Sequence, residues 1–169
     1  MITKATLQDV HALNILVNSA YRGDSSKKGW TTEANILGGI RTSEKDLSQI
    51  IESNSSSIFK FTENDTIIAC VLLESKKDKL YLGMLTVSPE IQNNGIGKKI
   101  LKFAESYAIE LNLPKIVMTV ISIREELIAW YKRHGYVGTG ITEPFPMDNP
   151  EFGLPKQTLE FIVLEKIIC

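Results

Sequence analysis

The sequence has few cysteines, no long apolar run and no excess of charge of either sign, and each absence excludes a class of protein. Its 2 cysteines among 169 residues are too few for a disulfide framework. Cys70 lies in an apolar run and is expected to be buried. No apolar run approaches the ~20 residues that a membrane-spanning helix needs. The 19 basic and 20 acidic residues nearly cancel, so the composition indicates neither a nucleic-acid partner nor a membrane surface.

The remaining composition is that of an ordinary globular enzyme or binding module. The hydrophobic fraction is 43% and the charged fraction is 23%. The length favours one domain over residues 1–169 with a sizeable core. The first residues show no signal-peptide pattern, so a cytoplasmic location is expected. His11 and His134 lie on predicted helices far apart in sequence, so solvated or capping roles are favoured and no metal site is expected.

The first third of the chain is predicted to be mainly helical. A strand over residues 2–5 precedes three helices, which begin after Thr6, after Glu33 and near Ser43. A polar loop is predicted between the first two helices.

The rest of the chain predicts a meander followed by crossovers. Strands are expected over 58–62, 67–73, 80–87, 115–121, from Tyr136 and over 158–168, with a hairpin turn at Asn64-Asp65 and a Pro-rich loop over 143–155. Helices are expected from Ile96 to Leu111 and from the S-x-x-E capping pattern of Ser122 and Glu125 to His134. This order predicts an α/β (α+β) fold: a mixed, mostly antiparallel sheet of about seven strands with helices on both faces.

The most informative segment is the turn Gln92-Asn93-Asn94-Gly95-Ile96-Gly97, between a strand and an amphipathic helix. Glycines permit positive φ and close approach to a ligand, and the first amides of a helix attract anions such as pyrophosphate. A plain loop that needs glycines to turn is the competing interpretation. A Walker loop is excluded by spacing, and Ile100 stands where a dinucleotide fingerprint needs glycine.

Two segments in this order carry a resemblance to a known family. Val87-x-Pro89 followed by Gln92-x-x-Gly95-x-Gly97 resembles the [QR]-x-x-G-x-[GA] signature of the GNAT superfamily of acetyl-CoA-dependent N-acetyltransferases. Downstream, residues 129–136, with Tyr131 and Gly135, resemble the L-Y-x-x-x-G-F segment of the same superfamily. The sequence is therefore identified as similar to GNAT enzymes, which implies a GNAT-like sheet that is splayed at the cofactor site.

The resemblance implies a cofactor site and a catalytic residue. Main-chain atoms of Leu85, Thr86 and Val87 would pair with the pantetheine arm of acetyl-CoA. The pyrophosphate would lie on the amides of Gln92, Asn93, Asn94, Gly95, Ile96, Gly97 and Lys98. Tyr131 would act as general acid toward the leaving thiolate, since a phenol with a reference pKa of about 10 is protonated at neutral pH. A purely packing role for Tyr131 on the apolar helix face stays open.

Two positions depart from the family pattern. Arg124 replaces a common asparagine and is assigned either to a cofactor phosphate or to capping a helix face. Gly83 replaces a common glutamate that helps to deprotonate the amine, so the general base is not identified. Glu33, Glu74 and Glu143 are candidates for it.

The acceptor is expected between two loops, over residues 21–41 and 140–155. Their aromatic and charged residues suggest a small, partly polar pocket; the candidate substrate residues are Tyr21, Trp30, Glu33, Glu143 and Phe145. Trp30 and Phe145 are equally consistent with covering the core edge.

The resemblance thus implies an acyltransferase with acetyl-CoA as donor co-substrate and an amine of a small molecule or peptide as acceptor, attacked directly in a ternary complex. An acetyl-CoA-binding sensor without catalysis is the alternative, which Gly83 favours. Transfer of a longer acyl group is a further possibility. Homodimerisation is expected from family habit alone.

Overall fold

The computed structural model describes residues 1–22, 27, 32–35, 37–91, 94–147 and 153–168. Seven strands form one sheet in the order β1-β3-β4-β5-β6-β9-β7. Their bounds are β1 Ile2–Lys4, β3 Ser56–Glu63, β4 Thr66–Ser75, β5 Leu80–Val87, β6 Lys115–Ile121, β7 Val137–Pro144 and β9 Glu160–Ile167. The β5–β6 pair is parallel and the other neighbours are antiparallel. This confirms the predicted mixed, mostly antiparallel sheet.

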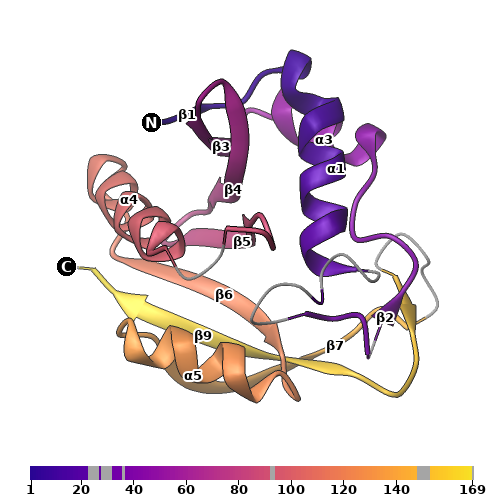
Figure 1. Ribbon diagram of the computed structural model, residues 1–169. Helices are drawn as coiled ribbons and strands as arrows, with labels where there is room; N and C mark the ends of the chain where they lie inside the picture. Colours follow the sequence, from indigo (N-terminus) through magenta and orange to yellow (C-terminus); the bar gives the residue numbers. More distant parts are fainter. Residues whose placement is uncertain (23–26, 28–31, 36, 92–93, 148–152, 169) are drawn as a thin grey trace.

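Helices cover both faces of the sheet, as predicted (Figure 1). On one face lie α1 (Val10–Tyr21), which follows a short 3₁₀ turn, and α3 (Glu44–Glu52). On the other lie α4 (Ile96–Glu110) and α5 (Glu125–Arg133). Successive residues of β4 show why both faces are covered: Cys70 packs in the α1–α3 core, while Ala69 and Val71 pack in the α4–α5 core. Alternation of side chains along a strand produces this division. Among the described helices, none is both long and apolar enough to cross a membrane.

Short-range sequence signals account for several element boundaries. Asn64 and Asp65 have φ of 52° and 61°, as expected for a two-residue hairpin turn that needs positive φ at both positions. The Ser43 side chain accepts a hydrogen bond of 3.2 Å from the amide of Asp46 at the start of α3. Both boundaries were predicted from sequence.

The predictions for two connecting segments were wrong. Residues 33–35 form a turn rather than the start of a helix, and Leu37–Gly38 (β2) pairs with Leu154–Pro155 (β8) in a separate two-stranded sheet. Long-range pairing overrides local propensity here, because β8 lies within the stretch predicted to be a Pro-rich loop. The strand β7 also extends to Pro144, further into that stretch.

The sheet opens between its two parallel strands. Cys70 pairs with Thr86 and Leu72 with Gly83, so β5 has one more residue than β4 between these pairs. The extra residue forms a β-bulge, in which Met84 has φ of 52°. Pairing of β5 with β6 is confined to Leu80 with Ile116 and Tyr81 with Val117. The strands then diverge, which confirms the predicted splay (Figure 1).

The cap at Ser43 can be tested by stability measurements. Ser43→Ala removes the acceptor for the Asp46 amide, and we expect the free energy of unfolding in urea to fall by about 1 kcal/mol. Ser48→Ala is the matched control within the same helix, since the Ser48 hydroxyl bonds only back to the Glu44 carbonyl. It should change stability by less than about 0.5 kcal/mol. Equal losses in both variants would contradict a capping role.

Candidate active site

Two neighbouring cavities occupy the region where β5 and β6 diverge. The first measures about 270 Å³ and the second about 220 Å³. They share five lining residues: Tyr21, Leu85, Arg124, Leu127 and Tyr131. The region therefore offers two compartments that meet at one wall.

The first cavity is lined by the bulged end of β5 and by the start of α4. Leu85, Thr86 and Val87 lie on one side, and Gly95, Ile96, Gly97 and Lys98 on the other. Gly95 is the N-cap of α4 and has φ of 75°, a left-handed conformation that favours glycine. The first amides of α4 have no acceptor within the helix and form the positive end of its dipole, so this end suits an anion.

The structure thus brings together nearly every residue assigned to the cofactor. Asn94 is exposed in the turn before α4. Gln92 and Asn93 lie outside the described residues.

Gly97 has a packing role that its place in the motif did not reveal. A Cβ atom at Gly97 would lie 3.1 Å from the Trp130 ring of α5. Trp130 itself lines the first cavity. The glycine therefore allows α4 to approach the Trp130 ring closely, so that the ring becomes a wall of the cavity.

Tyr131 lies at the junction of the two cavities. It projects from α5, is 6% exposed, and packs edge-on against Trp130 and Tyr136, with ring centroids 5.1 Å and 5.8 Å away. Burial raises the pKa of its phenol well above the usual value. The hydroxyl therefore stays protonated at neutral pH and is able to donate a proton.

Tyr21, predicted to contact the acceptor, connects α1 to the bulged strand. Its hydroxyl donates a 2.6 Å hydrogen bond to the Leu85 carbonyl of β5. Burial also raises the pKa of this phenol. Because the Leu85 carbonyl lies beyond the last β5–β6 pair, the Tyr21 hydroxyl satisfies a backbone group at the opened strand edge.

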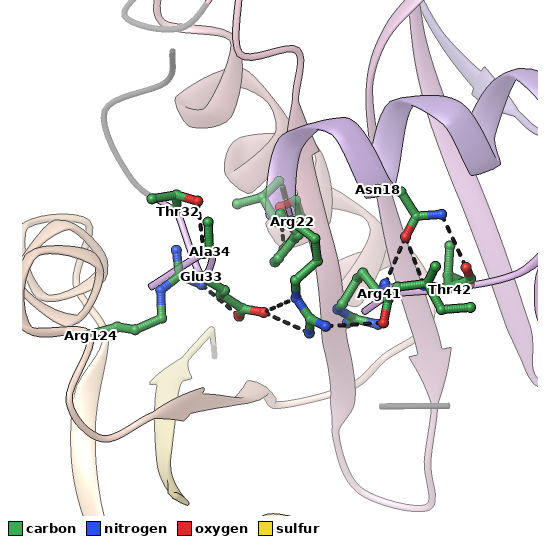
Figure 2. Close-up of polar contacts among 11 residues, drawn as sticks. Asn18, Arg22, Thr32, Glu33, Ala34, Arg41, Thr42 and Arg124 are labelled. Atoms are coloured by element: carbon green, nitrogen blue, oxygen red, sulfur yellow. Dashed lines mark hydrogen bonds and ion pairs between the residues drawn. The ribbon is translucent and has the colours of Figure 1, made fainter. Parts of the chain in front are cut away.

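Glu33 lies between two arginines that are far apart in sequence (Figure 2). Its Oε1 atom accepts from Arg22 at 2.8–2.9 Å, and its Oε2 atom accepts from Arg124 at 2.8 Å. All three residues are at most 6% exposed. Burial lowers the pKa of the Arg22 guanidinium, and Glu33 opposes that shift. Two cations thus hold both oxygens of the Glu33 carboxylate through charge-assisted hydrogen bonds.

The main chain fixes this network in place. The Glu33 amide donates to the Tyr21 carbonyl at the end of α1, and the Arg22 Nη1 atom donates to the Ile40 carbonyl. Arg124 is the N-cap of α5, and its amide donates to the Ile121 carbonyl. The predicted capping box at Ser122 was therefore wrong: α5 starts at Glu125. The Arg124 side chain, which was assigned to a cofactor phosphate or to helix capping, forms an ion pair with Glu33. It also lines the first cavity.

The second cavity contains several residues of the predicted acceptor pocket. Tyr21, Glu33 and Phe145 line it. Glu143 is exposed on β7, and Glu74 lies at the far end of β4 beside Lys76; neither lines the two cavities. Trp30 lies outside the described residues.

Gly83 faces the second cavity, where a family glutamate was expected. A Cβ atom at Gly83 would lie 3.0 Å from the Tyr81 ring. The ring therefore lies close to the space that a longer side chain at this position would enter. The Tyr81 hydroxyl pairs with the Thr119 hydroxyl at 3.3 Å.

Arg22 and Arg41 lie within the loop over residues 21–41 that was assigned to the acceptor, and both line the second cavity. Other lining residues were not assigned to the site from sequence, among them Tyr81, Leu127, Trp130 and Arg133. Helical spacing was available as a signal for one of them, because Leu127 is four residues before Tyr131 and such pairs share a helix face. Arg133 carried no local signal.

Comparison with known proteins identifies the family. The model of the acetyltransferase (GNAT) family matches residues 24–136, more than half of the chain. The chain belongs to this family. It is therefore an acetyltransferase that uses acetyl-CoA, as the two sequence motifs predicted.

Solved structures share the fold at low sequence identity. The ribosomal-protein-S18-alanine N-acetyltransferase of Escherichia coli is 15% identical, with a TM-score of 0.73 over 99% of this chain and 93% of that one. The PaiA N-acetyltransferase of Thermoplasma acidophilum, solved with coenzyme A, is 18% identical, with a TM-score of 0.72 over 99% and 98%. A GNAT acetyltransferase of Elizabethkingia anophelis with acetyl-CoA bound is 19% identical, with a TM-score of 0.59 over 74% and 83%. No curated protein sequence matches.

The buried ion network should contribute strongly to stability. Glu33→Gln leaves Arg22 and Arg124 buried without their counter-charge, and we expect the free energy of unfolding to fall by about 3 kcal/mol. Glu44→Gln is the control, because its exposed ion pair with His11 should contribute less than about 1 kcal/mol. Urea unfolding checks both. Similar small losses in the two variants would contradict the network.

Proposed function

We propose that the protein transfers the acetyl group to an amine by direct attack in a ternary complex. The observation that carries the proposal is the shared wall of the two cavities, where Tyr131 is buried. A donor thioester in the first cavity and an amine in the second would meet beside the Tyr131 hydroxyl. This supports a single transfer step without a covalent enzyme intermediate.

The first cavity suits the pyrophosphate and the pantetheine arm of the cofactor. The amides of Ile96, Gly97 and Lys98 at the start of α4 would hold the pyrophosphate, with the Lys98 side chain adding positive charge at the cavity wall. The backbone of β5 beyond its last pair with β6 would pair with the amides of the pantetheine arm. The Trp130 ring would flank the same arm.

The chemical step forms one bond and breaks another. The neutral amine attacks the thioester carbonyl carbon, a C–N bond forms, and the C–S bond breaks. The acceptor ammonium first loses a proton to water, because both oxygens of Glu33, the sole acid among the described residues that line the acceptor cavity, are bonded to arginines. The Tyr131 hydroxyl then donates its proton to the leaving thiolate, and the proton that the nitrogen releases as the amide forms returns through water to the Tyr131 oxygen.

The role of Tyr131 can be separated from packing by a matched pair of variants. Tyr131→Phe keeps the ring but removes the proton donor, so we expect kcat to fall by about 10²–10⁴ while the Kd for acetyl-CoA changes little. Tyr136→Phe is the control: the Tyr136 ring is buried, with its centroid 5.8 Å from that of Tyr131, and its hydroxyl has no hydrogen-bond partner among the described residues. Thiol release from acetyl-CoA over an amine panel measures the rates. Full activity in Tyr131→Phe would refute the assignment.

The cofactor cavity can be tested at Gly97. Gly97→Val places side-chain carbon against the Trp130 ring, which must move into the cavity. Overpacking of this kind costs about 1–3 kcal/mol, so the Kd for acetyl-CoA should rise about tenfold or more.

Gly138→Val on β7 is the control for Gly97→Val, because a Cβ there meets nothing within 4 Å. Calorimetry reports both affinities. Unchanged binding in Gly97→Val would place the cofactor elsewhere.

A further inference from the structure

The second cavity has an unusual charge balance for a site that receives an amine. Three arginines line it, Arg22, Arg41 and Arg124, and among its described lining residues Glu33 is the sole acid. Positive charges therefore exceed negative ones by two. An acceptor with several amines, such as a polyamine, would be repelled from this compartment.

Two of the arginines are already committed within the protein. Arg22 and Arg124 hold the two oxygens of Glu33, and all three side chains are buried. Their geometry is fixed by the main chain at the end of α1 and at the start of α5. One of the two excess positive charges is therefore shared within this buried, internally bonded group, and Arg41 carries the other.

The main chain at Arg41 is held in place, and its side chain rests on an aromatic ring. Asn18 of α1 accepts from the Arg41 and Thr42 amides, at 2.7 Å and 3.1 Å, which anchors the main chain at this point (Figure 2). The Arg41 guanidinium lies over the Tyr21 ring, 5.2 Å from its centroid. Within the part of the chain that the structure describes, no carboxylate forms an ion pair with it. The side chain is partly buried.

The position of Arg41 relates it to the reaction. The Tyr21 ring on which it rests also lines the first cavity, at the wall where the two compartments meet. A group bound by Arg41 would therefore lie next to the Tyr21 ring, which forms part of that wall. Apart from Thr119, the remaining lining is mainly apolar and aromatic, including Tyr81, Phe145 and Phe161.

From these observations we propose that the acceptor is a small amine that also carries a carboxylate, such as a free amino acid, and that Arg41 binds the carboxylate. The proposal rests on the proposed function, since it names the substrate class of that site. A guanidinium binds a carboxylate through two parallel hydrogen bonds, which fixes its orientation as well as its charge. The aromatic wall would receive an apolar side chain of the acceptor.

A matched panel of acceptors tests the substrate class. L-phenylalanine, L-phenylalaninamide and phenethylamine share one ring and one amine but differ in the carboxylate; L-leucine, leucinamide and isoamylamine form a second set, and spermidine represents polyamines. We expect kcat/KM for each amino acid to exceed that of its amide by about tenfold or more. Equal or faster turnover of the amides, the decarboxylated amines or spermidine would overturn the proposal.

Three variants link the preference to Arg41. Arg41→Gln should reduce the ratio of acid to amide to near one, mainly through KM, while Arg41→Lys should retain part of it because the charge remains. Lys45→Gln removes one exposed positive charge nearby in sequence and should leave the ratio unchanged. A ratio that survives in Arg41→Gln assigns the carboxylate to another group and refutes the role of Arg41.

Binding separates this proposal from the proposed function. Calorimetry of N-acetyl-L-phenylalanine and N-acetyl-L-phenylalaninamide, and of the corresponding leucine pair, on the protein loaded with coenzyme A requires no turnover. Tighter binding of the acids, lost in Arg41→Gln, supports the site even if no amine in the panel is acetylated. If amines are acetylated but amino acids are not preferred over their amides, the proposed transfer reaction is retained and the proposed acceptor class is refuted. Acids and amides that bind equally, or not at all, also overturn it.

Discussion

The bulge in β5 is the constraint on which the site depends. One extra residue at Met84 changes the direction of the strand, so that it pairs with β6 only at its beginning. Backbone groups beyond that point lose a neighbouring strand, and leaving such groups unsatisfied is costly. The Tyr21 hydroxyl, at the end of α1, donates a hydrogen bond to the Leu85 carbonyl and so satisfies it. The sheet therefore stays open without collapse, and both cavities lie beside the opened strand.

The ion network of Glu33 connects two distant segments beside the opened part of the sheet. Arg124 and Glu33 are separated by 91 positions in the chain, yet their side chains meet at 2.8 Å. This contact joins the segment after α1 to the start of α5, the helix that carries Tyr131. Because charge is costly to bury, the network is stable only when all three members are present. All three side chains line the second cavity, and one of them, Arg124, also belongs to the wall that the two cavities share.

The lining of the first cavity could be predicted from sequence better than that of the second, and the reason is physical. Phosphate binding uses a contiguous turn followed by a helix, so its residues are neighbours in the chain, and the bounds of β5 were predicted correctly as Leu80–Val87. The acceptor cavity is built by contacts across the fold. No local pattern pairs Glu33 with Arg124, and none predicts that Asn18 orients Arg41. The pairing of β2 with β8 was missed for the same reason.

The cationic acceptor cavity also bears on the absence of an evident base. Gly83 lines the cavity with the Tyr81 ring beside it, so the position that would have held a glutamate contributes no carboxylate. Nearby positive charge lowers the pKa of an ammonium group, because like charges disfavour the protonated form. An amine that enters beside the arginines would lose its proton more readily than in water. A carboxylate on the same molecule would be drawn toward Arg41, which would leave the amine free to face the thioester. One charge distribution would thereby select the acceptor, orient it and assist its deprotonation.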